Sequence, residues 1–202
     1  FAVPRPSVEL PFTGERMTTA MEGQIEFEHF HRYCLARDYC AGLDVLDVAS
    51  GEGYGSALLA GVARSVVGVE IDSGVVAHAR AAYAAPNLHF LAGDAQAIPL
   101  ANASVDVVVS FETLEHVPDQ ARFLLEVRRV LRAGGLFIVS TPDRTVYSAP
   151  GSDPNPYHVH ELTVPELTAL MSAHFQHHTI LHQRPVLGSI VAGELAVNWR
   201  SY

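Results

Sequence analysis

The feature that most constrains this chain is a buried strand that runs directly into a bend containing three glycines. Residues 45–56 read VLDVASGEGYGS, in which an apolar run is followed by Gly51, Gly53 and Gly55. Glycine is favoured where backbone must turn tightly or approach a ligand closely, because it has no side chain to obstruct either. A strand that ends in such a bend is typical of a parallel α/β sheet, in which ligands bind beyond the carboxyl ends of the strands.

Strands and helices alternate on both sides of this bend. Apolar runs rich in β-branched residues predict strands at 43–48, 65–71, 87–92, 104–111 and 136–141. Segments with helical periodicity lie between most of these runs, at 54–63, 73–84 and 119–132. Such alternation implies right-handed crossovers and a parallel sheet that is covered on both faces.

The last part of the chain has a different pattern. Residues 175–183 and 187–195 predict two further strands, joined by a short turn at Arg184–Pro185. This arrangement predicts an antiparallel pair at one edge of the sheet. The fold class that we expect is therefore α/β, with a doubly wound, Rossmann-like and mostly parallel sheet of seven strands that has an antiparallel edge strand.

A chain of 202 residues has the size of one compact domain. We expect a single domain over residues 1–202, in which residues 1–41 form a helical cap segment and residues 42–202 form the Rossmann-like core. Within the cap, residues 18–41 predict a helix with one face made of Met21, Ile25, His29 and Tyr33. Two roles are open for this helix: it closes over a site together with Arg32, or it only packs against the sheet.

Composition excludes several classes of partner. The net charge of −9 disfavours a nucleic-acid partner, because such binding depends on clustered cations. No run approaches the about 18 apolar residues of a membrane span, and the first residues lack a signal-peptide pattern. Only Cys34 and Cys40 are present, at a spacing that fits neither a disulfide framework nor a metal pair. We expect a cytoplasmic protein whose oligomeric state the sequence leaves open.

Three acids stand at or near the ends of successive predicted strands: Asp47, Glu70 and Asp94. An acid beside a glycine bend can accept paired hydrogen bonds from the two hydroxyls of a ribose, and Glu70 fits that role. A dinucleotide fingerprint would need GxGxxG, but Ser56 occupies the place of its third glycine. The alternative is that each acid is a solvated carboxylate at a strand end.

Four segments, in this order and spacing, resemble the successive motifs of class I S-adenosylmethionine-dependent methyltransferases. They read VLDVASGEGYGS, VVGVEID, AGDAQAIPL and SFETLEHVPD, and the resemblance covers about residues 43–143. Two shorter segments, GERM near the start and NPYHVHEL after the fifth predicted strand, resemble small methyltransferases of type 11 that accompany polysaccharide and glycosyl-transfer machinery. The resemblance implies S-adenosylmethionine as the cofactor.

The resemblance also implies roles for individual residues. The glycine bend would pass under the methionine part of the donor, with Asp47 near its ammonium, Glu70 on its ribose, and Asp94 with Ala95 at its adenine edge. Arg16 suits the donor carboxylate, because a guanidinium matches a carboxylate. The expected cofactor-binding residues are Arg16, Asp47, Ala49, Gly51, Gly53, Tyr54, Glu70, Ile71, Asp94, Ala95, Gln96 and Phe111.

Two departures from related patterns bear on this site. Ala49 stands where the family usually has glycine, and we take the added methyl as a mild change. Ser56 replaces a third helix-packing glycine, which is dispensable because S-adenosylmethionine carries no phosphate.

A second group of residues suggests a metal site on the acceptor side. Glu112, Glu115 and His116 are spaced i, i+3 and i+4, so they share one face if a helix begins there. This oxygen and nitrogen set suits Mg²⁺, Mn²⁺ or Zn²⁺. It resembles the ExxEH element of small-RNA 2′-O-methyltransferases and ubiquinone-pathway O-methyltransferases, which implies a divalent ion, and His158 or His160 would complete the ligands.

The same residues allow roles without a metal. Glu115 and His116 would then cap or brace the loop, and His116, His158 or His160 would act as the general base. The catalytic candidates that we retain are His116, His158 and Glu112.

The function that we expect is methyl transfer from S-adenosylmethionine to a hydroxyl oxygen of a saccharide, a polysaccharide or another small molecule, with or without help from a metal. One alternative is an NAD-dependent Rossmann oxidoreductase, against which the GxGxG spacing and the lack of an obvious Tyr-x-x-x-Lys pair argue. Another is a module that binds S-adenosylmethionine without catalysis. Acceptor specificity should reside in the loop 142–160 and the N-terminal helix, and the sequence does not identify the acceptor.

Overall fold

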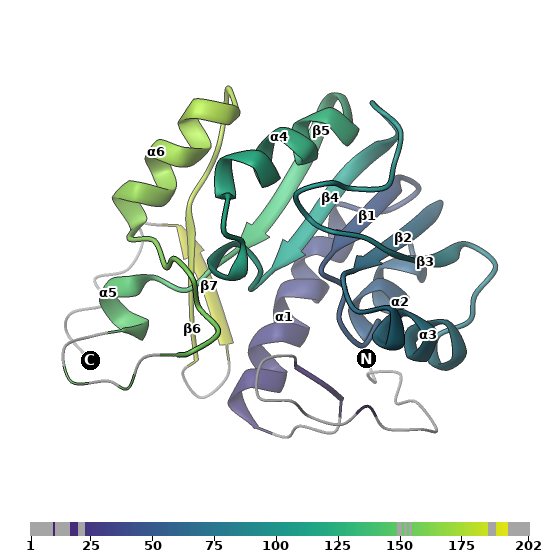
Figure 1. The fold of residues 1–202 in the computed structure, drawn as a ribbon, viewed down its shortest axis with the longest axis horizontal. Coiled ribbons are helices and arrows are strands. Elements are labelled where there is room, and N and C mark those ends of the chain that lie inside the picture. Colours follow the sequence, from purple (N-terminus) through teal and green to yellow (C-terminus); the bar gives the residue numbers. More distant parts are fainter. Residues whose placement is uncertain are drawn as a thin grey trace.

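A parallel sheet of five strands forms the centre of the protein (Figure 1). The computed structural model describes residues 10, 17–19, 23–148, 151, 153, 155–185 and 189–193. The strands lie in the order β3-β2-β1-β4-β5, and every neighbouring pair is parallel. Their bounds are Asp44–Val48 for β1, Ser65–Glu70 for β2, Leu88–Ala92 for β3, Val105–Phe111 for β4 and Leu131–Ser140 for β5.

Helices cover both faces of this sheet. They are α1 (Gln24–Asp38), α2 (Tyr54–Ala60), α3 (Ser73–Ala82), α4 (Gln120–Val130), α5 (Arg144–Tyr147) and α6 (Val164–His174), with a short 3₁₀ helix, η1, at Leu114–His116. None of those helices, in the part of the chain that is described, is long and apolar enough to cross a membrane.

Two buried clusters divide the core between the two faces. One joins the sheet to α1, α2 and α3 and includes Val107, and the other joins it to α4 and α6 and includes Val108. Successive residues of β4 thus point to opposite faces, as expected of a strand buried on both sides. The predicted α/β, Rossmann-like and mostly parallel sheet is confirmed for these five strands.

The prediction for the end of the chain is confirmed only for the antiparallel pairing of its last two strands with each other. The last two strands, β6 (Leu181–Pro185) and β7 (Ser189–Gly193), pair antiparallel with each other in a separate two-stranded sheet. Seven strands in one sheet and an antiparallel edge strand are therefore not observed among the described residues. The predicted turn at Arg184–Pro185 is wrong, because both residues lie within β6. The side chain of Gln183 explains the position of β6, since its Nε2 donates to Glu28 O of α1 at 3.0 Å.

The N-terminal helix is shorter than predicted, and one of its residues fixes it to the core. The predicted helix over 18–41 is observed as α1, from Gln24 to Asp38. Tyr33 is buried, whereas Ile25 of the same predicted face is 50% exposed. Met21 lies outside the described residues. The helix therefore packs through Tyr33, and the part nearer its start faces solvent.

Gly55 allows Tyr33 to lie against α2. A Cβ built on Gly55 would lie 2.0 Å from Cζ of Tyr33, far inside van der Waals contact. Gly55 is therefore a packing glycine one residue before Ser56. This contact secures α1 beside the end of β1.

Replacing Gly55 by alanine should lower the stability of the fold, because the new methyl group forces the Tyr33 ring to move. Overpacking of this kind lowers the free energy of unfolding by about 1–3 kcal/mol. Urea denaturation measures the change. Gly61→Ala is the matched control, because Gly61 has a φ of −64° and a Cβ there has no neighbour nearer than 3.3 Å. Equal losses in the two variants would contradict this role of Gly55.

Candidate functional site

A wide groove lies at the carboxyl ends of the parallel strands. Strand order reverses at β1, whose neighbours are β2 on one side and β4 on the other, and crevices form at such points. The groove has a volume of about 2110 Å³. Sites for one small molecule measure about 300–1,000 Å³, so this groove has room for two ligands side by side.

The backbone between β1 and α2 bends through an unusual run of left-handed residues. Ala49 has a φ of 58°, Gly51 of 54° and Gly53 of 100°. A left-handed conformation costs a residue with a side chain about 1–2 kcal/mol, so alanine at position 49 is not the mild change that we expected. Gly53 precedes the first residue of α2 and packs closely on Phe90, whose ring lies 2.8 Å from a Cβ built there.

Asp47 lies beneath this bend and connects three elements. It is 0% exposed, accepts a hydrogen bond from Ser56 Oγ at 2.6 Å, and accepts one from the Tyr33 hydroxyl, which is 3.2 Å from each carboxylate oxygen. Burial raises the pKa of Asp47 to about 7, and the charge of Glu70 adds to the rise. Asp47 is not among the residues that line the groove, so in this geometry it braces the bend.

Glu70 closes the bend from the neighbouring strand. It ends β2, is 5% exposed and lines the groove. Its carboxylate accepts hydrogen bonds from the backbone N–H of Gly51 at 3.1 Å and of Asp72 at 3.2 Å. These bonds fix the orientation of a carboxylate at the groove wall. The next residue, Ile71, is 72% exposed and provides an apolar surface beside it.

The loop after β3 supplies the next part of the wall. Asp94 accepts a hydrogen bond from the backbone N–H of Gln96 at 2.8 Å, which tightens this loop. The side-chain oxygen of Gln96 accepts a hydrogen bond from the backbone N–H of Asp119 at 3.0 Å, which connects this loop to the start of α4.

Most of the expected cofactor-binding residues meet at the groove. Those that line it are Ala49, Gly51, Tyr54, Glu70, Ile71, Asp94, Ala95, Gln96 and Phe111. Asp47 and Gly53 lie behind this wall, and Arg16 lies outside the described residues. Their binding roles stay predictions.

One buried residue near the groove was not predicted, and one residue of the predicted N-terminal helix lines the groove. Glu52, within the bend, is 1% exposed and accepts hydrogen bonds from Thr19, from its backbone N–H at 2.5 Å and from its hydroxyl at 2.8 Å. This contact holds residues 17–19 beside the bend. His29 of α1 lines the groove, and burial lowers its pKa to about 4, with the charge of Arg32 adding to the fall. The partner of Glu52, Thr19, lies 33 positions away in the sequence, so no local pattern marks Glu52. His29 agrees with the alternative in which the N-terminal helix lies over a site.

Glu112 does not share a face with Glu115 and His116. It follows β4 with a left-handed φ of 49°, and only the 3₁₀ turn η1 begins after it. Its carboxylate oxygen Oε1 accepts a hydrogen bond from Ser140 Oγ at 2.6 Å and lies 3.2 Å from Arg32 Nη1. Glu112 therefore belongs to a separate contact on the groove wall, and the expectation of one shared helix face is corrected.

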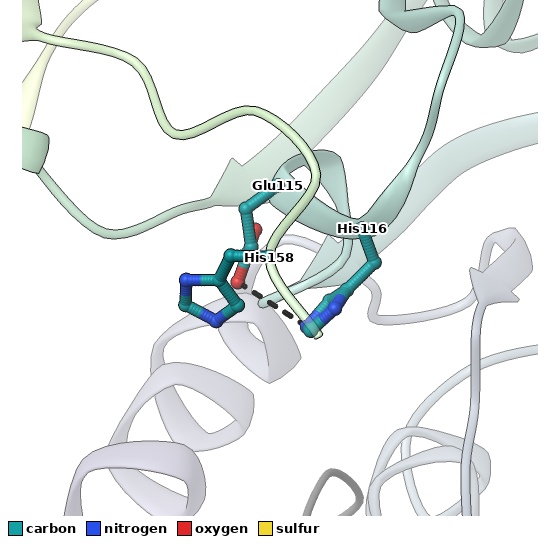
Figure 2. Close-up of side chains that lie close together, drawn as sticks. All are labelled: Glu115, His116 and His158. Carbon is teal, nitrogen blue, oxygen red and sulfur yellow. Dashed lines mark ion pairs between the residues drawn. The ribbon is translucent and has the colours of Figure 1, made fainter. Parts of the chain in front are cut away.

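Glu115, His116 and His158 do come together (Figure 2). One ligand atom from each lies within 4.8 Å of the other two, and His116 Nε2 is 3.8 Å from Glu115 Oε1. The loop that carries His158 is held against η1 because the backbone N–H groups of Val159 and His160 donate to Glu115 O. The exposed side chain of His160 is not part of this group.

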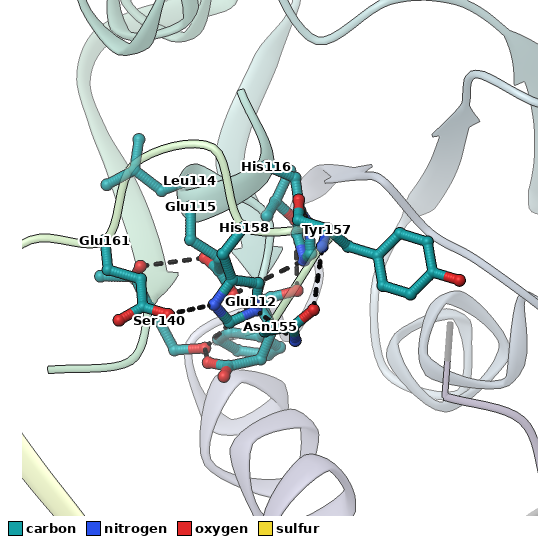
Figure 3. A network of polar contacts seen from close by, with 12 residues as sticks. Glu112, Leu114, Glu115, His116, Ser140, Asn155, Tyr157, His158 and Glu161 are labelled. Atoms are coloured by element: carbon teal, nitrogen blue, oxygen red, sulfur yellow. Dashed lines mark hydrogen bonds and ion pairs between the residues drawn. The ribbon is translucent and has the colours of Figure 1, made fainter. Parts of the chain in front are cut away.

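Hydrogen bonds orient both imidazoles of this group (Figure 3). His116 Nδ1 lies 2.9 Å from Tyr157 O. A carbonyl oxygen only accepts, so Nδ1 carries the proton and Nε2 keeps its lone pair on the side of Glu115. His158 Nδ1 donates to Glu161 Oε1 at 2.5 Å, and its Nε2 accepts from Asn155 Nδ2 at 3.0 Å.

The carboxyl of Glu115 is buried beside these imidazoles. Glu115 is 1% exposed and accepts a hydrogen bond from Thr141 Oγ1 at 2.9 Å. Burial raises its pKa to about 8, and the charge of Glu112 adds to the rise. A carboxyl with this pKa is a group that a nearby positive charge would convert to its ionised form.

Comparisons with known proteins agree with one another. A sequence profile described as "Methyltransferase domain" matches residues 46–139. Over 166 residues the chain is 46% identical to a protein of Mycolicibacterium smegmatis named "Probable S-adenosylmethionine-dependent methyltransferase", covering 80% of this chain and 63% of that protein. Over 109 residues it is 37% identical to the ubiquinone biosynthesis O-methyltransferase of Azorhizobium caulinodans, covering 53% of this chain and 43% of that protein. The chain thus spans less than two thirds of either relative.

The fold is also similar to that of solved structures. One is a complex between the Haloferax volcanii Trm112 methyltransferase activator and a methyltransferase. The match has a TM-score of 0.66 and 24% sequence identity, and it covers 80% of this chain and 72% of the other.

The raised pKa of Asp47 predicts a pH dependence of stability. An acid whose folded-state pKa of about 7 exceeds its ordinary 3.8 favours the fold when protonated, and this contribution is lost as pH rises through about 7. The stability of the protein relative to Asp47→Asn should therefore fall between about pH 5 and about pH 8. Urea denaturation of both proteins at the two pH values measures it. A difference that does not change with pH would contradict the buried carboxyl described above.

Proposed function

We propose that the protein is a class I S-adenosylmethionine-dependent methyltransferase, which the match over residues 46–139 and the similarity to the M. smegmatis protein support. We propose further that it transfers the donor's methyl group to a hydroxyl oxygen of a saccharide or another small molecule. The observation that carries the proposal is the carboxylate of Glu70, held by the glycine bend and facing a groove with room for donor and acceptor.

The donor's adenosine fits the wall on the β2 side. Glu70 accepts hydrogen bonds from the two ribose hydroxyls, as a carboxylate with several lone pairs can. The adenine lies over the exposed side chain of Ile71, with its edge at Asp94 and Ala95. The backbone of the bend passes close to the methionine part, because Gly51 has no side chain to keep the ligand away.

The charges of the groove favour a neutral acceptor. Among the described residues that line it, the arginines are Arg32 and Arg184, and the sequence contains no lysine. Arg32 is already paired with Glu112. Phosphate and carboxylate acceptors are recognised through cations, which are few here. The partner proposed is therefore a neutral saccharide or small-molecule acceptor.

The rim of the groove offers this acceptor an apolar surface. Exposed apolar and aromatic side chains on α1, α5 and β6 line it, namely Ile25, Val146, Tyr147 and Leu181. The Tyr147 ring is stacked on His158 at a centroid distance of 5.0 Å, so it is held in place. Ligand sites typically combine such surfaces with a few polar groups. A sugar suits that combination, because it has an apolar C–H face and hydroxyls around its ring.

Catalysis in this proposal is mainly positioning. The acceptor oxygen must lie in line with the sulfonium methyl, and a bound geometry of this kind supplies a large part of the rate enhancement. His116 Nε2 receives the hydroxyl proton, because its lone pair is kept available by the bond from Nδ1 to Tyr157 O. His158 is the alternative base, and Glu112 lies on the same wall as a further acidic group.

Glu115, His116 and His158 also fit a divalent metal such as Mg²⁺, Mn²⁺ or Zn²⁺. Both imidazoles donate a hydrogen bond from Nδ1 to an oxygen, His116 to a carbonyl and His158 to a carboxylate. Histidines that bind a metal usually have such support. These three residues would hold the ion. When bound, it would lower the pKa of the acceptor hydroxyl. Glu112 is not part of this set, since Ser140 and Arg32 hold it elsewhere.

Donor binding tests the proposal directly. Calorimetry should detect S-adenosylmethionine binding, and Glu70→Gln should weaken it about tenfold or more, because hydrogen bonds to a charged group are worth about 1.5–3 kcal/mol. Glu28→Gln is the matched control, since Glu28 lines the same groove on α1. Binding of NAD without S-adenosylmethionine would defeat the proposal. Labelled-methyl transfer to neutral glycosides then separates an enzyme from a module that only binds.

The metal is tested without an activity assay. Excess Mn²⁺ or Zn²⁺ should raise the unfolding temperature, because a ligand that binds only the folded state stabilises it. His116→Ala and His158→Ala should lose most of this rise, whereas His160→Ala should keep it, since the His160 side chain is outside the group. No rise in the wild-type protein, or an equal rise in all variants, would remove the metal from the proposal.

A further inference from the structure

Two buried hydrogen-bond donors face the groove beside the glycine bend. The hydroxyl of Tyr54 has no hydrogen-bond partner among the described residues, although the residue is only 4% exposed and lines the groove. Nη1 of Arg32 is also buried and makes no hydrogen bond among the described residues, although it forms an ion pair with Glu112 Oε1 at 3.2 Å. A buried donor without an acceptor costs about 1–3 kcal/mol. Such groups call for an acceptor that a ligand supplies.

The two donors share one electrostatic neighbourhood. Burial raises the pKa of the Tyr54 hydroxyl, the charge of Asp47 adds to the rise, and the charge of Arg32 opposes it. Tyr33, adjacent to Arg32 on α1, packs edge to face on Tyr54 with ring centroids 5.4 Å apart. A hydroxyl and a guanidinium with unused hydrogens together match a carboxylate, which accepts several hydrogen bonds.

Arg32 is held in position from the opposite side. Its Nε donates to Gln183 Oε1 of β6 at 2.5 Å, and Nε2 of Gln183 donates to Glu28 O at 3.0 Å. The guanidinium is thus fixed before any ligand arrives, which reduces the entropy that binding must offset.

The same guanidinium forms an ion pair with an acid. Arg32 Nη1 is 3.2 Å from Glu112 Oε1. Among the described residues, the arginines that line the groove are Arg32 and Arg184. Glu112 is held there by Ser140 Oγ and by a left-handed backbone that residues with side chains rarely adopt. Strained backbone of this kind is concentrated at functional sites.

Resting on the proposed function, we propose that Tyr54 and Arg32 receive the α-carboxylate of the methyl donor, and that Glu112 competes with that carboxylate for Arg32. The carboxylate accepts a hydrogen bond from the Tyr54 hydroxyl and lies close to Arg32 Nη1. Arg32 then lies between two carboxylates, so its attraction for Glu112 is shared. The ion pair between Arg32 of α1 and Glu112, the residue after β4, therefore couples the donor end of the groove to its acceptor end.

Two ligands that differ only at the amino-acid end test this assignment. S-adenosylhomocysteine carries the α-carboxylate, whereas 5′-methylthioadenosine has the same adenosine and lacks it. Calorimetry should show that Arg32→Gln lowers the affinity for S-adenosylhomocysteine about tenfold and that Tyr54→Phe lowers it severalfold. Losses of this size are expected when a hydrogen bond to a charged group is removed. Neither variant should change the affinity for 5′-methylthioadenosine.

Glu112→Gln gives an expectation of opposite sign. The amide oxygen can still accept from Ser140 Oγ, but the charge that competes for Arg32 is gone, so S-adenosylhomocysteine should bind about threefold more tightly. Glu28→Gln is the matched control, because it removes a groove charge whose side chain is bonded to Gln24 instead. Equal tightening in the two variants would overturn the competition.

The outcomes distinguish a failure of the proposed donor from a failure of the carboxylate assignment. If neither ligand binds the wild-type protein, the proposed donor is wrong. If both bind and the Arg32 and Tyr54 variants affect them equally, the donor stands and the carboxylate assignment fails. Unfolding by urea checks the fold of each variant. Tyr54→Phe should be no less stable than the wild type, because its hydroxyl has no hydrogen-bond partner within the described part of the chain, and a marked loss would also overturn the assignment.

Discussion

The whole site depends on a buried carboxylate under a strained bend. Asp47 accepts hydrogen bonds from Ser56 of α2 and from Tyr33 of α1, so one side chain holds both helices at the end of β1. The bend above it follows left-handed backbone at Ala49, Gly51 and Gly53. With the bend fixed in this way, the N–H of Gly51 reaches Glu70, and the groove receives a carboxylate of defined orientation.

Much of the fold was predictable because it rests on local patterns. Five apolar runs predict β1 to β5, and the acids Glu70 and Asp94 follow two of them, so their meeting at one edge follows from the parallel arrangement. The position of the final antiparallel pair was not predictable in the same way. Its position depends on contacts of Gln183 with α1, which join residues about 150 positions apart and leave no periodic signal.

The site shows the same division. The residues of the bend and of the strand ends were found from spacing, whereas Glu52 was missed because only the folded chain buries it. Glu112 was placed with Glu115 and His116 on the assumption of an α-helical turn. Glu112 has a left-handed backbone and is followed by a 3₁₀ turn, which directs its side chain to Arg32 and Ser140 instead. No residue type in that segment predicts such a backbone.

The central claim is that the glycine bend and Glu70 hold the adenosine of a methyl donor. The most direct measurement is a crystal structure of the protein with S-adenosylhomocysteine. The account predicts that both ribose hydroxyls lie within about 3.2 Å of the Glu70 carboxylate, with the adenine against Ile71. A ligand bound elsewhere, or a ribose turned away from Glu70, would contradict it.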